Sequence, residues 1–164
     1  MDLAAALGAA GVGLGDGTPA SIPDATGGSL TSSALVSEDG LVASVRVVVK
    51  VAHGDPSQLL VTLTSPDGTL VVLHDHQPGT TESPNGVNRV DSLFVAYPDD
   101  RAPAEGLDAF AGRPAAGFWT LTVTDDVATA VVGPAQRLLG WALEVENAAG
   151  PEPAVVVPVV AHAA

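Results

Sequence analysis

The histidines of this chain that could bind a metal ion are expected where a strand ends. His74 and His76 flank Asp75, and a spacing of two residues places both imidazoles on one face of an extended strand. Such a pair can bind Zn²⁺ when a third ligand lies nearby. The sequence offers no evident third ligand, so we interpret this segment as an exposed polar stretch.

Aspartates form a second group of possible metal ligands. Asp91, Asp125 and Asp126 stand at predicted strand ends, and Asp99 and Asp100 stand in a predicted loop. Ca²⁺ takes about six to eight oxygen ligands from loops of this kind. The dense alternation of aspartates in an EF-hand loop is absent. The sequence therefore allows a calcium site at the first three residues, with hydrogen-bonded turns as the alternative. No other cofactor is expected.

No pattern of residues indicates a catalytic centre. A serine hydrolase needs a nucleophile, a base and an orienting carboxylate in one site, and no nucleophile motif surrounds any serine here. His53 follows a predicted strand, where a histidine with structural hydrogen bonds is a better interpretation than a general base. Trp119 and Trp141 each begin an inward-facing apolar row, which favours core packing over a sugar-binding platform. We therefore predict that the protein is not an enzyme.

The scaffold that must position these residues is clearest from Val45 to Leu73. Valines alternate with Arg46 and Lys50 in the first part, and apolar residues alternate with threonines over 59–64. Because successive side chains of a strand point to opposite faces, each segment has one apolar face. Ser65-Pro66-Asp67-Gly68 has the composition of a type I turn. This region predicts an antiparallel β unit with one buried face.

Other segments extend this pattern. Residues 119–124 and 141–146 alternate between apolar and polar side chains, and shorter strands are expected at 33–37 and 90–97. One helical turn is expected within 104–110. Polar connections join about eight or nine short strands, so the chain is predicted to be an all-β, antiparallel jelly-roll β-sandwich.

The composition limits the possible partners. The chain has 19 acidic and 6 basic residues, giving a formal net charge of −13, and it has no cysteine. A nucleic-acid binder needs a basic surface, and an anionic membrane would repel this charge. No apolar stretch reaches the length of a membrane span. We therefore expect a protein partner, no nucleic acid, no membrane insertion and no disulfide.

The two ends of the chain differ in composition from the rest. Residues 1–21 are rich in Ala and Gly, and Asp2 stands where a secretory signal would carry positive charge, so we do not read a signal peptide. Residues 147–164 are rich in Pro and Val. Four valines there are suited to an edge strand that would add to a neighbouring subunit: Val155, Val156, Val157 and Val159. Pro158 interrupts this run, as is tolerated in an edge strand.

Three motifs follow one another in the central region: Ser65-Pro66-Asp67-Gly68-Thr69, Gly117-Phe118-Trp119-Thr120-Leu121 and Gly140-Trp141-Ala142-Leu143. Over roughly residues 22–146 the chain resembles the P domain, also called the Homo B domain. That domain is the β jelly roll that follows the catalytic domain in subtilisin-like proprotein convertases, and it also occurs in many bacterial secreted proteins. The resemblance implies a jelly roll at 22–146 between arms at 1–21 and 147–164.

The chain departs from this family in three places, one of which is the connection Gly133-Pro134-Ala135-Gln136-Arg137 before the last strand. Gly54-Asp55-Pro56-Ser57-Gln58 replaces the shorter Gly-Asp turn of the family and must change the local backbone. Asp91-Ser92 stands where the family often has two acidic residues, which weakens an ion site there.

Three classes of function fit these observations. The first is a non-catalytic interaction module whose arms engage neighbouring subunits or a larger assembly. The second, implied by the resemblance, is an accessory domain that stabilises and helps mature a subtilisin-like protease. The third is an adhesion module that binds carbohydrate or calcium. We favour the first, in an extracellular protein or on the surface of a virion-like particle, because a chain of 164 residues that starts at Met1 is expected to have no room for a protease domain. Fold alone does not determine function.

Overall fold

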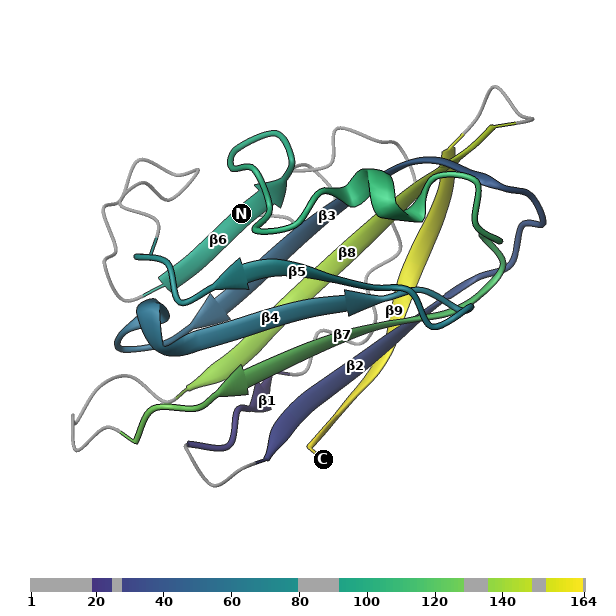
Figure 1. The fold of residues 1–164 in the computed structure, drawn as a ribbon. Helices are drawn as coiled ribbons and strands as arrows, with labels where there is room; N and C mark the ends of the chain where they lie inside the picture. The colour runs from purple at the N-terminus through teal and green to yellow at the C-terminus, as the bar shows by residue number, and fades with distance from the viewer. Residues whose placement is uncertain (1–18, 25–27, 80–91, 129–135, 149–152, 164) are drawn as a thin grey trace.

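The computed structural model describes residues 19–24, 28–79, 92–128 and 136–148, and the backbone of 153–163 (Figure 1). Within these ranges no helix is long and apolar enough to cross a membrane. The strands are β1 (Ala20–Ser21), β2 (Ser29–Val36), β3 (Val42–Ala52), β4 (Leu59–Thr64), β5 (Leu70–Asp75), β6 (Ser92–Tyr97), β7 (Gly117–Asp125), β8 (Arg137–Asn147) and β9 (Pro153–Ala163). Two short 3₁₀ helices, η1 (Pro56–Gln58) and η2 (Leu107–Phe110), interrupt them. The all-β prediction and the helical turn within 104–110 are confirmed.

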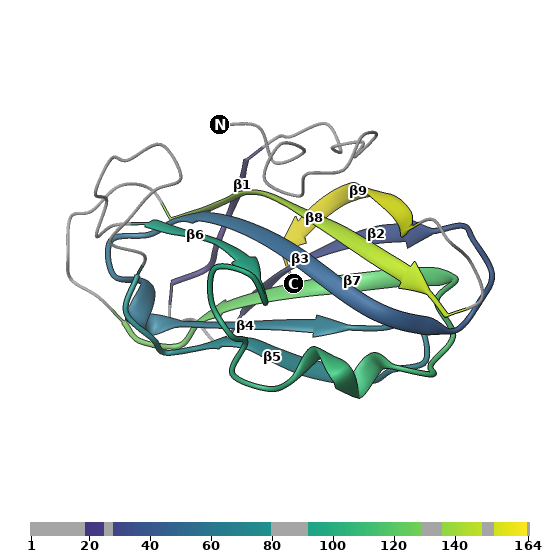
Figure 2. The same ribbon diagram turned by 90° about the horizontal axis from the view of Figure 1, so that it is seen from above.

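The strands form two antiparallel layers, which Figure 2 shows from above. Sheet A has the order β6-β3-β8, with β1 also paired to β8. Sheet B has the order β5-β4-β7-β2. The apolar faces of both sheets meet in one core, as alternating strands require. The antiparallel β-sandwich is therefore confirmed, while the jelly-roll path of the chain stays a prediction.

Strand β9 connects the two sheets. Its first part pairs with β8, where Val155 lies opposite Glu144, and its second part pairs with β2, where Val157 lies opposite Leu35. Pro158 and Val159 fall at a register shift, where the missing N–H of proline is tolerated. The segment that we expected to be an arm thus adds a strand to both sheets of its own chain, at the edge of each.

Both tryptophans lie in the core, as predicted. Trp119 is fully buried, its Nε1–H donates to the Ala115 carbonyl at 2.9 Å, and its ring meets Phe110 edge-on at 5.0 Å. The Nε1–H of Trp141, in sheet A, donates to Ser32 Oγ, in sheet B, at 2.8 Å. Because each indole buries its apolar surface and satisfies its N–H, core packing replaces the sugar-platform interpretation.

Two motif glycines are explained by this packing. Gly68 closes the turn after β4 with φ +88°, and its N–H donates to the Ser65 carbonyl at 2.9 Å. Gly117 begins β7 with φ +127°, and a Cβ there would lie 2.7 Å from the Cβ of Pro66. Both positions therefore exclude larger side chains, one through its backbone conformation and one also through close contact.

We expect Trp119→Ala to lower the free energy of unfolding by about 3–5 kcal/mol, because it empties a large, fully buried volume. Phe118→Ala is the matched control, since the neighbouring ring is 57% exposed, and it should cost less than about 1 kcal/mol. Urea denaturation of both variants measures the difference. Equal losses would place Trp119 outside the core.

Candidate functional site

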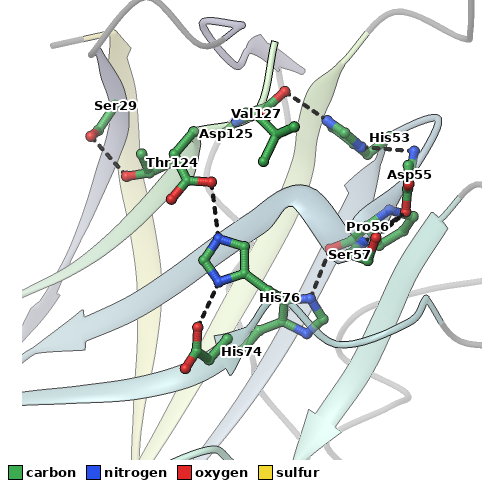
Figure 3. A network of polar contacts seen from close by, with 12 residues as sticks. Ser29, His53, Asp55, Pro56, Ser57, His74, His76, Thr124, Asp125 and Val127 are labelled. Carbon is green, nitrogen blue, oxygen red and sulfur yellow. Dashed lines mark hydrogen bonds and ion pairs between the residues drawn. The ribbon is translucent and has the colours of Figure 1, made fainter. Parts of the chain in front are cut away.

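One end of the sandwich gathers three of the histidines, and Figure 3 shows their polar contacts. We call this region the histidine end; it comprises His53, His74, His76, Asp125 and Asp126. The antiparallel register explains the gathering: β5 and β7 end here opposite the start of β4, with Asp75 opposite Leu60 and Asp125 opposite Leu59. Strand β3 of sheet A ends directly before His53.

A buried hydrogen bond joins His53 to Asp125. The Asp55 N–H donates to His53 Nδ1 at 2.9 Å, so the other ring nitrogen carries the proton and donates to Asp125 Oδ2 at 3.0 Å. The second carboxylate oxygen accepts the Val127 N–H at 3.2 Å. The side chains of the pair are only 1% and 0% exposed. The prediction of a hydrogen-bonded structural histidine is confirmed at this position.

Helix η1 supplies groups that hold two of the histidines. Asp55 caps it: its Oδ1 accepts the Ser57 N–H at 3.0 Å and the Ser57 hydroxyl at 2.5 Å. These hydrogen bonds, with the Ser57 hydroxyl contributing most, lower the pKa of Asp55. The cap leaves the Asp55 N–H for His53, and the Pro56 carbonyl accepts from His74 Nε2 at 2.9 Å. Asp55 and Pro56 thus form a scaffold for these rings.

His74 is buried, contrary to our interpretation of this segment as exposed. A register shift between Val61 and Thr62 places His74 opposite Val61 and Val72 opposite Thr62, so both Leu73 and His74 turn inward. Burial lowers the pKa of His74, and its Nδ1 has no hydrogen-bond partner among the described residues. The ring is therefore held neutral.

His76 is the exposed member of the three. Its Nδ1 lies 2.6 Å from Asp75 Oδ1 and its Nε2 lies 2.9 Å from Asp126 Oδ1. The hydrogen bond to Asp75, followed by that to Asp126, raises the pKa of His76. As an imidazolium it donates to both carboxylates and connects the ends of β5 and β7. Each of its nitrogens therefore faces a carboxylate, whereas Nε2 of His74 is directed at the Pro56 carbonyl.

The predicted calcium ligands have separate places. Asp91 lies outside the described residues, Asp125 uses both oxygens internally, and Asp126 faces His76. Across the part of the chain that the structure describes, no group of three or more His, Cys, Asp or Glu could hold a metal ion. An ion at Asp125 would share oxygens that already accept the His53 and Val127 hydrogen bonds. Calcium binding stays a prediction.

The geometry of His53 and Asp125 limits their chemistry. A histidine beside a carboxylate has the arrangement of a general base with its orienting group. A base also needs a ring nitrogen directed at the substrate, whereas both nitrogens of His53 are engaged and the ring is shielded from solvent. The sequence did not reveal this pair; the only available signal was that both residues stand at strand ends. The arrangement holds the two sheets together.

Comparison with known families matches residues 42–145 to the proprotein convertase P-domain. A search of the curated proteins finds no match. The fold is similar to that of the serine protease of Aeromonas sobria in complex with its chaperone, with a TM-score of 0.48 and 21% identity over 85% of this chain. A second structure of that protease has a TM-score of 0.47 and 21% identity over 84%. This chain covers 21% of either protease chain, about a fifth of its length.

We expect His53→Leu to lower the free energy of unfolding by about 3–5 kcal/mol, because it leaves a buried carboxylate without its partner. Asp126→Asn is the matched control: it changes the next carboxylate along the chain, which is exposed, and should cost less than about 1 kcal/mol. Chemical denaturation at neutral pH measures both. A small loss for His53→Leu would show that the pair contributes little to the sandwich.

His76 should make stability depend on pH. Because its pKa in the folded state lies above the ordinary 6.5, its contribution is present below that pH and disappears as the pH rises through the raised pKa. We expect His76→Gln to lower the melting temperature by about 1–3 °C near pH 5.5, and by less near pH 9. Adding Asp126→Asn to this variant should cause little further loss, and an additive loss would refute the coupling.

Proposed function

Because the chain belongs to the proprotein convertase P-domain family, we propose that it is a non-catalytic accessory module that binds and stabilises a subtilisin-like catalytic domain. The observation that carries this proposal is the family match, which extends from the start of β3 nearly to the end of β8. It therefore covers most of both sheets of the sandwich. The catalytic domain would lie in the same polypeptide or in a separate one.

The histidine end supports the non-catalytic part of the proposal. His53 and Asp125 are buried in hydrogen bonds, and His74 donates to a backbone carbonyl. His76 is exposed, but carboxylates flank both of its nitrogens. Each of these side chains has a structural role that substrate binding would disrupt. The family also supports an extracellular location.

Self-assembly through the ends of the chain is the finer form of this proposal. For the C-terminal segment, the pairing of β9 with β2 and β8 uses its strand-forming backbone within one chain. The N-terminal segment is therefore the better candidate for contact with a neighbouring subunit. Removing residues 1–18 leaves β1 to β9 in place, so this variant tests the arm separately from the fold.

To test the proposal, the purified chain is added in excess to the catalytic domain of a subtilisin-like protease from the same source. By mass action, binding should raise the melting temperature of the catalytic domain and lengthen its active half-life. The chain alone should not cleave a generic protein substrate. Turnover by the pure chain that one substitution abolishes would refute the non-catalytic role. No effect on the catalytic domain at any ratio would refute the accessory role.

A further inference from the structure

The outer face of sheet B is lined by hydroxyl side chains. On β7 the outward positions are Thr120, Thr122 and Thr124, and all their inward neighbours are buried. The register places two rows of hydroxyls across three strands: Thr62–Thr122–Thr31 and Thr64–Thr120–Ser33. We call this surface the hydroxyl face. It consists of 13 outward residues: Ser29, Thr31, Ser33 and Leu35 of β2, Leu60, Thr62 and Thr64 of β4, Leu70 and Val72 of β5, and Phe118, Thr120, Thr122 and Thr124 of β7. Asp75, at the end of β5, is not included.

The rows are regular because side chains on one face of a sheet repeat every second residue. Neighbouring strands lie about 4.8 Å apart, and outward residues of one strand lie about 6.7 Å apart. Cross-strand hydroxyls are close enough to bond, as between Ser29 and Thr124 at 2.8 Å and between Ser33 and Thr120 at 3.1 Å. The face is thus a fixed array of groups that can each donate and accept.

Exposed apolar side chains lie at one end of this face. Leu35 of β2 is 46% exposed and sits directly opposite Phe118 of β7, which is 57% exposed. Leu70 of β5 is 53% exposed and lies opposite Thr64 of β4. Within the described residues these are three of the five exposed large hydrophobic side chains. Grouped apolar exposure of this kind is typical of an interaction surface.

The hydroxyl face also differs from the rest of the protein in charge. None of its outward side chains, as defined above, is charged, although the chain has a net charge of −13. Carboxylates stand only at its margin: Asp75 and Asp126 are bridged by His76, Asp67 of the β4–β5 turn lies 3.6 Å from Arg113, and Glu105 accepts the Val72 N–H at the edge of β5. The outer face of sheet A is different, because Arg46 pairs there with Asp99 and Glu144.

We propose that the hydroxyl face binds a second copy of this chain, forming a reversible two-fold dimer centred near Phe118 and Leu35. A two-fold interface brings the same patch of both subunits together, so the patch must be complementary to itself. Hydroxyls meet this requirement because each can donate to or accept from its symmetry mate. Apolar side chains also meet it, whereas any strongly acidic surface of this chain would repel its copy.

The size of the face sets the strength of this dimer. Its 13 outward residues, each covering about 32 Å², provide roughly 400 Å² per subunit. That is about half of a standard interface, so we expect a dissociation constant of about 0.1–1 mM. The charge elsewhere on the two subunits opposes association, and salt screens it over a Debye length of about 10 Å at 0.1 M. Association should therefore strengthen as salt is added, which distinguishes this dimer from one held by ion pairs.

The experiment is sedimentation of the full chain up to about 1 mM at low salt and at about 0.5 M NaCl. We expect a monomer–dimer equilibrium whose dissociation constant falls at least about tenfold at the higher salt. Phe118→Ser and Thr122→Glu should each weaken the dimer by about tenfold or more. Circular dichroism checks that each variant is folded. If Thr122→Glu does not fold, Phe118→Ser alone tests the proposal.

Two matched controls lie outside the hydroxyl face. Leu41→Ser removes a side chain that is 51% exposed next to β3, and Ala43→Glu adds the same charge as Thr122→Glu on sheet A. Leu41→Ser should leave the dissociation constant unchanged, and at about 0.5 M NaCl, where the added charge is screened, Ala43→Glu should leave it unchanged as well. A chain that stays monomeric under all conditions would refute the proposal. This would also be the result if the hydroxyl face bound a different protein or a glycan instead of a second copy. A dimer that Phe118→Ser leaves unchanged would refute it as well.

Discussion

Two buried hydrogen bonds connect the sheets of this sandwich, and its polar interior depends on them. Backbone ladders hold strands together within a sheet, and β9 carries its ladder from one sheet to the other at their edges. Across the core, side-chain bonds fix how one sheet lies over the other. Here Trp141 of sheet A donates to Ser32 of sheet B, and His53, after β3, donates to Asp125 of β7. A buried polar group without a partner costs free energy, so a slip of one sheet over the other would break both bonds at once.

The histidines of one end illustrate how environment sets the charge of the same side chain. His74 is buried beside few polar groups, and its pKa falls, whereas exposed His76 lies between two carboxylates, and its pKa rises. The two residues are only two apart in sequence, so their different pKa shifts come from the fold. The register shift in β5 turns His74 inward, and the ends of β5 and β7 place carboxylates beside His76. Helix η1 and its cap residue Asp55 supply the backbone groups that hold two of these rings.

The two outer faces of the sandwich also have different characters. Sheet A carries ion pairs and a cation–π contact between Lys50 and Phe94, which suits a surface in contact with water. The hydroxyl face of sheet B presents hydroxyls and grouped apolar side chains, and charged residues are at its margin. In a strongly acidic protein, the uncharged surface is where a second copy of the chain meets the least electrostatic repulsion.

The sequence by itself determined the strands and the core, because a period of two is a local property. The valines of β3 and the rows that begin at Trp119 and Trp141 indicated which faces are buried, and the turn at Ser65–Gly68 indicated how two strands connect. Tertiary structure decided what depends on register and on distant contacts. It paired His53 with Asp125, 72 residues apart in the chain, turned His74 inward through a one-residue shift, and placed β9 across both sheets. These outcomes follow from which strands are neighbours, which alternation alone does not specify.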